Sequence, residues 1–485
     1  MRPLLLLTLS LAACGPKDAP IESAAGSADP RFERPAPLAR PAFDLPTPQR
    51  ATLSNGVAVV LVENHELPVV DLRIVFSSGS WTDPVGKEGL ASSAMDMLNE
   101  GAGDLDAVGY ASALRKLGAR VGAGAGLDSA SVTLHTLNKH LEPALDLWAL
   151  ALLDPAFDAD EWDRVRKQRV QNVAAARTNP NAIAGRVFDR VMFGDTYDGR
   201  FETEGSLKAI SAADLEAWHA DQLVSGNALI LAGGDITLEE LTPLLEARLA
   251  DWSGESTRAA PEITVHAPTS TVIHLIDKPG AAQSVIVAGR PVGHRTDPHY
   301  DALYVANTIW GGMFMSRLNM NLREDKGYTY GARSRLSNGL APTIWNASTS
   351  VKSDTTADAL SEIFGELAAI GDARPLTEDE RAYFAGSLVS GYPARFETTD
   401  YLLGQQSEVW RYELPADWLE SYIPRVEAVT AGQAQVAFLE QVATQPLTVV
   451  VVGDLATIRA PIEALGHPVV ELDVDGAPVS EPNSD

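Results

Sequence analysis

The feature that most constrains this fold is a pattern that occurs twice, 219 residues apart. Residues 228–235 (ALILAGGD) and 447–454 (LTVVVVGD) each read as a buried strand that ends in Gly-Asp. A helical pattern follows each of them, over 237–249 and over 456–465. Repetition at this interval indicates a duplicated domain. The length of 485 residues agrees, because it exceeds what a single core can fill.

The first half mixes strands with helices. Residues 57–65 (VAVVLVENH) and 69–76 predict two strands after a turn at 52–56. Helical periodicity follows at 88–98, 106–117, 138–153, 160–177 and 180–192. Strands that pair locally, with helices gathered on one face, predict an α+β fold of two homologous sandwich domains in tandem.

The N-terminus predicts an exported, lipid-anchored protein. An apolar run from Leu4 to Ala13 is too short to span a bilayer and has the form of a signal-peptide core. Leu11-Ala12-Ala13-Cys14 resembles a bacterial lipobox, in which Cys14 would be lipidated and become the mature N-terminus. The alternative is an ordinary signal peptide with an incidental cysteine. The residue directly after Cys14 is glycine and not aspartate, which favours anchoring in the outer membrane, facing the periplasm.

Composition excludes several other classes of function. Cys14 is the only cysteine, so disulfides within the chain and a thiolate metal cluster are excluded. A formal net charge of −27 argues against nucleic acid as a partner.

The sequence predicts six divisions. A signal peptide (1–14) and a flexible tether (15–45) precede a first domain (46–252). A linker (253–271), a second domain (272–475) and a tail (476–485) follow.

Residues 79–98, GSWTDPVGKEGLASSAMDML, carry a family resemblance. The frame GKEGLA…ML resembles the start of the insulinase-type (M16) zinc peptidases. In that family Gly-Leu-Ala is followed by H-x-x-E-H, whose histidines bind zinc and whose glutamate activates water. Here the three positions hold Ser92, Met95 and Asp96. No histidine lies between His65 and His135, so a shifted copy of the motif is excluded.

The third zinc ligand of the family is a glutamate on a later helix. The similar segment here is 163–172, DRVRKQRVQN, which places Asn172 at the ligand position. Catalytic zinc takes three protein ligands, mostly imidazole nitrogens with one carboxylate, and a hydroxyl, a thioether and an amide are poor substitutes. We therefore expect degenerate zinc-site positions at Ser92, Met95, Asp96 and Asn172, and no cofactor in this chain.

The second half retains a family frame. Residues 306–330 contain GGMFMSRL followed by LREDKGYTY, which is similar to the M16 pattern G-G-x-x-S-R-L…L-R-E-x-K-G-x-x-Y. The segment 318–326 predicts a helix that ends at Gly327, and the next strand should place Tyr328 and Tyr330 on one face. The resemblance implies that Arg323 and Tyr330 reach the site of the other half and hold the substrate backbone. The alternative is that Arg323 complements the helix dipole while Tyr330 packs in the core.

The resemblance implies a divided active site. In some M16 enzymes one chain carries H-x-x-E-H and the other lacks zinc and lends its Arg/Tyr pair. This chain is similar to the second kind, so we expect a heterodimer with a zinc-bearing M16 partner, a peptide substrate, and inactivity alone. The main alternative is a peptide-binding or scaffold lipoprotein of M16 fold with no proteolytic role. An autonomous hydrolase has little support, because Ser92 has no His or Lys close in sequence and the chain lacks a G-x-S-x-G elbow.

Overall fold

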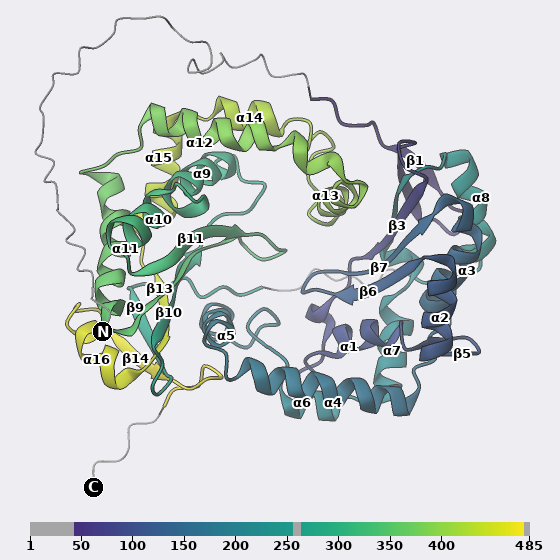
Figure 1. The fold of residues 1–485 in the computed structure, drawn as a ribbon, viewed down its shortest axis with the longest axis horizontal. Coiled ribbons are helices and arrows are strands. Elements are labelled where there is room, and N and C mark those ends of the chain that lie inside the picture. Colours follow the sequence, from purple (N-terminus) through teal and green to yellow (C-terminus); the bar gives the residue numbers. More distant parts are fainter. Residues whose placement is uncertain (1–42, 256–262, 480–485) are drawn as a thin grey trace, which may run out of the picture. The chain divides into compact units, whose positions relative to one another are not determined.

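The computed structural model describes residues 43–255 and 263–479 (Figure 1). The signal peptide, Cys14 and most of the tether lie outside the described residues, as do 256–262 of the linker and the last six residues. Among the described helices, none combines the length and apolar character needed to cross a bilayer. Because Cys14 lies outside the described residues, the lipid anchor stays a prediction.

A six-stranded sheet in the order β1-β2-β8-β3-β7-β6 forms the first half. Its strands are β1 (Gln49–Thr52), β2 (Ala58–Glu63), β3 (Val69–Phe76), β6 (Arg120–Ala125), β7 (Ala130–Leu137) and β8 (Ala228–Gly234). Strand β3 runs antiparallel to both β7 and β8, whereas β2 runs parallel to β8. A separate short pair consists of β4 (Gly101–Ala102) and β5 (Leu105–Asp106).

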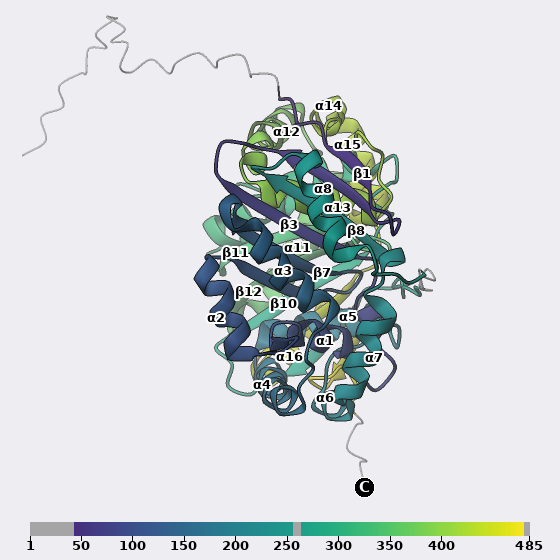
Figure 2. The ribbon, with the colours of Figure 1, turned by 90° about the vertical axis from the view of Figure 1, so that its right-hand side faces the viewer.

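Six of the described helices of the first half follow the predicted ranges closely, whereas Glu204–Ala209 and Ala212–Gln222 form two helices that were not predicted. They are α1 (Leu90–Met97), α2 (Ala107–Leu117), α3 (Leu141–Leu153), α4 (Ala159–Ala176), α5 (Pro180–Phe193), α6 (Glu204–Ala209), α7 (Ala212–Gln222) and α8 (Leu238–Leu249). Helices α2, α3 and α8 cover one face of the sheet (Figure 2). Side-chain caps fix several of the ends. Asp158 accepts from the first backbone amides of α4, and Asn179 does so before Pro180 of α5.

The second half repeats this sheet in the order β14-β9-β13-β10-β12-β11. Its strands are β9 (Val272–Asp277), β10 (Gln283–Pro291), β11 (Thr329–Ser337), β12 (Ile344–Lys352), β13 (Thr448–Gly453) and β14 (Val469–Leu472). The recurring strands, β8 and β13, occupy the same position in both sheets. Only the outer strand differs, since β1 pairs antiparallel with β2 and β14 pairs parallel with β9. The duplication inferred from the sequence is therefore confirmed in the topology.

The helices of the second half, except for α13, gather around its own sheet. They are α9 (Tyr300–Asn307), α10 (Arg317–Asn319), α11 (Thr356–Gly371), α12 (Glu378–Gly391), α13 (Thr399–Arg411), α14 (Tyr422–Ala428), α15 (Ala431–Phe438) and α16 (Leu455–Glu463). Three π-helical turns interrupt them, at Thr308–Gly312, Met320–Asp325 and Leu439–Ala443.

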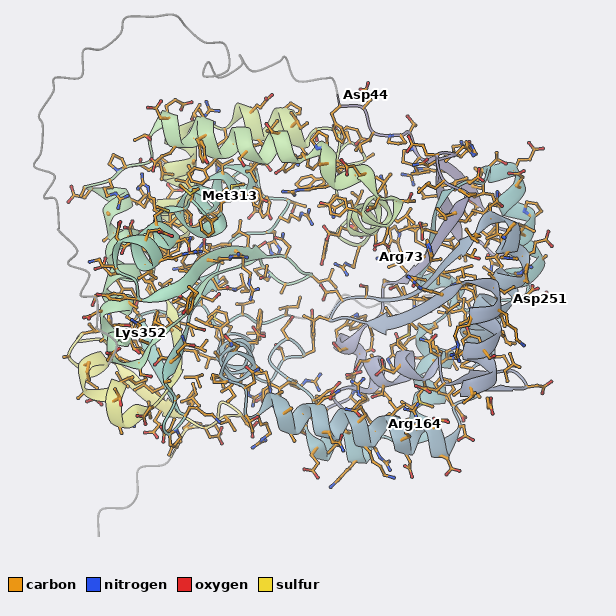
Figure 3. All side chains as sticks on the ribbon, in the orientation of Figure 1. Asp44, Arg73, Arg164, Asp251, Met313 and Lys352 are labelled. Atoms are coloured by element: carbon orange, nitrogen blue, oxygen red, sulfur yellow. The ribbon has the colours of Figure 1, made fainter. Side chains whose placement is uncertain are left out.

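Helices also cover the second face of each sheet, which corrects the expectation of helices on one face only. Helix α5 of the first half packs on β10 and β13 of the second half, and α13 of the second half packs on β3 and β8 of the first. The central strands β8 and β13 are thus buried on both faces, and β13 accordingly reads as an unbroken apolar run. On β3, Arg73 (labelled in Figure 3) donates to Asp400 of α13 at 2.7 Å.

Two glycines permit this exchange of helices. A Cβ atom on Gly233 of β8 would lie 2.2 Å from the Thr399 side chain of α13. A Cβ atom on Gly289 of β10 would lie 2.8 Å from the Phe188 ring of α5. Glycine is therefore required where each exchanged helix meets the opposite sheet.

One end of the predicted tether and one end of the predicted tail contact the folded part of the chain. Phe43 contacts the rings of Tyr392 and Phe396, and Leu45 packs beside Leu402, so the end of the predicted tether docks through apolar side chains. At the other end, the backbone amide of Val479 donates to a carbonyl of β14.

Candidate functional site

Helix α1 carries the three positions of the missing zinc motif. The Asp83 carboxylate, 5% exposed, accepts hydrogen bonds from the amides of Gly89 and Ala91 at 2.7 and 2.8 Å and fixes the start of the helix. Met95 is completely buried in the core of the first half. Its thioether therefore serves packing, at the position where the family places the glutamate that activates water.

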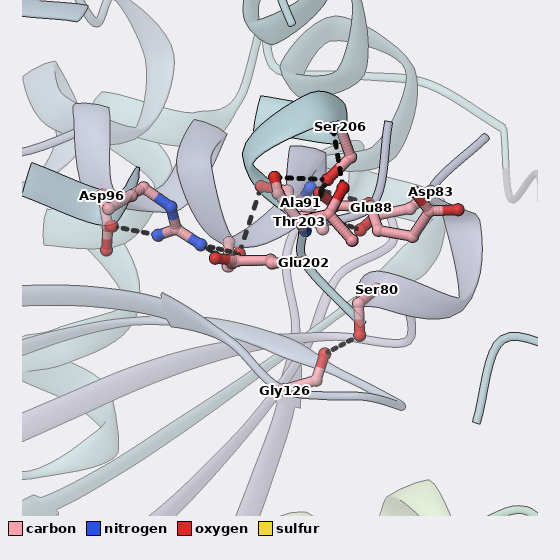
Figure 4. Close-up of polar contacts among 12 residues, drawn as sticks. Ser80, Asp83, Glu88, Ala91, Asp96, Gly126, Glu202, Thr203 and Ser206 are labelled. Carbon is pink, nitrogen blue, oxygen red and sulfur yellow. Dashed lines mark hydrogen bonds and ion pairs between the residues drawn. The ribbon is translucent and has the colours of Figure 1, made fainter. Parts of the chain in front are cut away.

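The guanidinium of Arg169, on α4, joins the remaining motif positions. It donates to Ser92 Oγ at 2.6 Å and to Asp96 at 2.5 Å. It also contacts Glu202, whose carboxylate accepts from Ser92 Oγ at 3.1 Å. In Figure 4, dashed lines join the labelled Asp96 and Glu202 to the guanidinium between them. We call these four residues the Arg169 cluster. Arg169 is only 13% exposed, so its charge compensates two carboxylates in a partly buried setting.

Sequence reasoning missed two members of this cluster. Glu202 lies 110 residues from Ser92, in a loop before α6, and no local pattern marks it. Arg169 lies on α4, the helix that was expected to carry the third ligand position. Asn172, the predicted position, is instead exposed and accepts from Gln168 of its own helix at 3.1 Å.

Zinc does not fit the Arg169 cluster. A hydroxyl and two carboxylates are present, whereas zinc favours imidazole nitrogen or thiolate with an open coordination position. A permanently charged guanidinium already lies among these oxygens. In residues 43–255 and 263–479, no three His, Cys, Asp or Glu side chains gather as metal ligands would. Ser92, Arg169 and Glu202 nevertheless line a cavity of about 400 Å³ beside the end of β6.

The retained frame of the second half has a structural part. Arg317 donates to both carboxylate oxygens of Glu380, each at 2.7 Å, and to the carbonyls of Arg374 and Pro375. Its side chain is 7% exposed. Burial raises the pKa of Glu380, but hydrogen bonds from Arg317 and Thr377 outweigh burial and lower that pKa to about 2. This clamp ties α10 to the start of α12.

The predicted helix over 318–326 is present but irregular. Its residues after Asn319 form a π-helical turn, and the chain leaves it through Gly327 at φ +66°, the expected left-handed end. Beyond it the register shifts between Thr329 and Ala332, so β11 begins with a bulge. The expectation that Tyr328 and Tyr330 share a face is wrong. The bulge breaks the alternation, so Tyr328 packs on the core and Tyr330 does not.

Arg323 and Tyr330 form the exposed part of the frame. Tyr330 is 90% exposed, which rules out the alternative that it packs in the core. The Arg323 side chain is 37% exposed, with its guanidinium 4.6 Å from the Phe314 ring and 3.1 Å from Glu324. Within the part of the chain that the structure describes, neither side chain has a hydrogen bond, ion pair or ring contact with the Arg169 cluster. The structure therefore does not bring the two sets of predicted residues into contact.

A larger cavity, of about 600 Å³, lies between α5 and the sheet of the second half. Two carboxyl groups line it. Burial raises the pKa of Asp189 to about 7, with Arg335 acting in the opposite direction. Burial, together with the neighbouring carboxyl groups of Asp128 and Asp189, raises the pKa of Asp198 to about 7. Near neutral pH these groups can accept hydrogen bonds from a basic side chain. Nothing in the local sequence marks either residue.

Comparisons with known proteins agree with the fold. Residues 58–197 match the family described as insulinase (peptidase family M16), and residues 209–383 match the peptidase M16 inactive domain. The non-peptidase homolog YmxG of Helicobacter pylori is 22% identical over 381 residues, which cover 77% of this chain and 86% of that relative. An uncharacterized zinc protease of Mycobacterium leprae is 24% identical over 349 residues, covering 70% of this chain and 77% of that protein.

Solved structures give the same result. The peptidase M16 inactive domain from Pseudomonas fluorescens superposes with a TM-score of 0.77 at 26% identity, covering 84% of this chain and 98% of that chain. A protease from Helicobacter pylori superposes with a TM-score of 0.74 at 16% identity, covering 84% of this chain and all of that one. The two-domain order, the shared sheet topology and these matches lead to one assignment: the chain belongs to the M16 family of insulinase-type peptidases.

Proposed function

We propose that this non-catalytic M16-like chain is the substrate-binding subunit of a heteromeric zinc peptidase and orients peptides for a zinc-bearing partner. One contrast carries the proposal. Arg169 occupies the centre of the degenerate zinc site, while Tyr330 remains 90% exposed in an otherwise retained frame. A phenol exposed at the surface is available to another molecule, whereas the Arg169 cluster is internally compensated.

The chemistry of the exposed pair fits substrate orientation. Arg323 and Tyr330 can donate hydrogen bonds to a peptide carbonyl or carboxylate, which adds orientation and stabilises developing negative charge. The 600 Å³ cavity supports a peptide ligand, since Asp189 and Asp198 offer acceptors and Arg333 and Arg335 offer donors on its walls. Zinc would be held by the partner. Acylation of Cys14 would keep the assembly at the outer membrane, facing the periplasm.

A divided active site is tested by reconstitution with an H-x-x-E-H chain encoded nearby. Alone, this chain should show no peptidase activity; mixed with the partner, activity should appear and be abolished by chelation. Tyr330→Phe removes one hydroxyl and should lower turnover roughly a hundredfold, the usual effect of losing about 2–4 kcal/mol of such stabilisation. Arg323→Ala should be at least as damaging, because it also removes a charge.

A scaffold or peptide-binding lipoprotein without proteolytic role is the second candidate. It is favoured by the lack of contact between Arg323 or Tyr330 and the Arg169 cluster in the described residues. If both variants assemble with the partner and cleave peptides at the unmutated rate, the pair has no part in catalysis and this second function replaces the first.

A further inference from the structure

Tyrosines and arginines gather in a second cavity of the second half. This cavity measures about 330 Å³ and lies among α9, α13, α14 and the turn at Pro393–Glu397. Six of the eleven tyrosines of the chain line it, together with Trp418, four arginines and two carboxylates. We call it the tyrosine–arginine pocket. Its charged residues are Arg295, Arg395, Arg411, Arg425, Asp301 and Glu408.

The pocket is positively charged although the chain carries a net charge of −27. Both carboxylates are already paired, Glu408 with Arg295 at 2.5 Å and Asp301 with Arg425 at 2.9 Å. Arg411 donates to the neutral oxygens of Ser129 and Tyr412, and its guanidinium lies over the Tyr412 ring. The lining therefore holds two more arginines than carboxylates, which gives it a positive charge.

Buried hydrogen-bond donors without a partner also indicate an anionic ligand. Four buried donor groups at this pocket have no acceptor on the protein: Nε of Arg295, Nε of Arg411, Nη2 of Arg425 and the hydroxyl of Tyr422. A buried donor without a partner costs about 1–3 kcal/mol. The buried groups without a partner at this pocket are three guanidinium nitrogens and one hydroxyl, and each of them can donate. The complement to such a wall is a ligand that brings acceptors and negative charge.

The aromatic walls are held in place by their own contacts. The rings of Tyr392 and Tyr422 stack with centroids 4.1 Å apart. Trp418 has the guanidinium of Arg425 at 3.8 Å from its ring centroid and that of Arg295 at 5.6 Å. Burial raises the pKa of the Tyr392 and Tyr422 phenols, so both stay protonated. Tyr422 is thus a neutral donor, with Tyr304 as its neighbour.

We propose that the tyrosine–arginine pocket binds a small oxyanion, a carboxylate or phosphate group attached to an aromatic or apolar body. Arg395, Arg411 and the Tyr422 hydroxyl would hold the anion, and the tyrosine rings would pack on the body. This site is separate from the Arg169 cluster and from Arg323 and Tyr330. It does not depend on a zinc-bearing partner.

Titration calorimetry on the full chain at low salt tests the site. Phenyl phosphate and N-acetylphenylalanine are the phosphate and carboxylate probes, and phenol and N-acetylphenylalaninamide are their uncharged counterparts. Saturable binding of either anion that weakens with added salt, with no binding of the neutral compounds, is the expected result. Tighter binding of phenyl phosphate would identify a phosphate site, and tighter binding of N-acetylphenylalanine a carboxylate site.

Variants locate the binding. Arg395→Ala should weaken it about tenfold or more, because a charge-assisted hydrogen bond is lost, and Tyr422→Phe should weaken it severalfold. Arg381→Ala, on α12 and away from the pocket, is the matched control and should bind as the unmutated chain does. Thermal unfolding checks that each variant is folded. Failure of both anions to bind, or binding that Arg395→Ala and Tyr422→Phe leave unchanged, would overturn the proposal.

Discussion

The two regions that resemble M16 motifs differ in how their functional positions are buried. In the first half the sequence frame around α1 survives, but its functional positions have become internal: Met95 is core and Ser92 and Asp96 are bound by Arg169. In the second half Arg317 is the internal residue, while Arg323 and Tyr330 face outward. A motif match therefore mixes residues that hold the fold with residues available to a ligand, and only burial and contacts separate them.

The Arg317 clamp should give the largest effect on stability. Arg317→Ala leaves Glu380 without its partner and removes bonds to two carbonyls, so we expect a loss of about 3–5 kcal/mol in the free energy of unfolding. Chemical denaturation measures it. Arg323→Ala, six residues along, is the matched control and should cost about 1 kcal/mol or less. Equal losses for the two variants would break the comparison.

The Arg169 cluster should give the next largest effect. Arg169→Met keeps an unbranched, flexible side chain but removes the cation that lies between Asp96 and Glu202. Because the Asp96 side chain is 45% exposed, solvent reduces the penalty, and we expect a loss of about 2–3 kcal/mol. Arg164→Ala, on the same helix with a 58% exposed side chain, should cost less than about 1 kcal/mol. A stable Arg169→Met chain would show that the cluster is dispensable.

Acid stability sharpens the same contrast. The pKa of Glu380 is lowered to about 2 from its ordinary value of 4.5, so the folded state favours the ionised carboxylate. Its contribution is fully present above about pH 4.5 and is lost as pH falls through 2. With screening allowed for, we expect about 2 kcal/mol. Denaturation between pH 2 and 5 should show a shallower acid decline for Glu380→Gln than for the unmutated chain. The exposed Glu440→Gln should leave the decline unchanged.

The exposed pair should give the smallest effect on stability. Tyr330→Phe should change the free energy of unfolding by no more than about 0.5 kcal/mol, because the phenol is 90% exposed and has no structural partner among the described residues. Thermal unfolding of this variant beside Tyr110→Phe, whose buried hydroxyl donates to the carbonyl of Leu147 at 3.1 Å, provides the comparison. A large loss for Tyr330→Phe would mean that Tyr330 holds the fold, contrary to its proposed role.

Local sequence predicted part of the elements, mainly in the first half. The strand expected at 69–76 is β3 with the same bounds, and the helices expected at 160–177 and 180–192 are α4 and α5 to within a residue or two. Periodicity and capping residues suffice for this, because both act within one or two turns of chain. The duplication was also readable, since both copies keep the same strand and Gly-Asp ending.

Contacts between distant segments could not be read in this way. The exchange of α5 and α13 between the sheets, the approach of Glu202 to Ser92, and the tyrosine–arginine pocket each join segments far apart in the chain. The sequence by itself determined that the zinc ligands are missing, because residue identity decides coordination chemistry. Only the tertiary structure decided that Arg169 fills their place and that Tyr330 stays exposed, because burial and charge pairing arise when distant segments pack together.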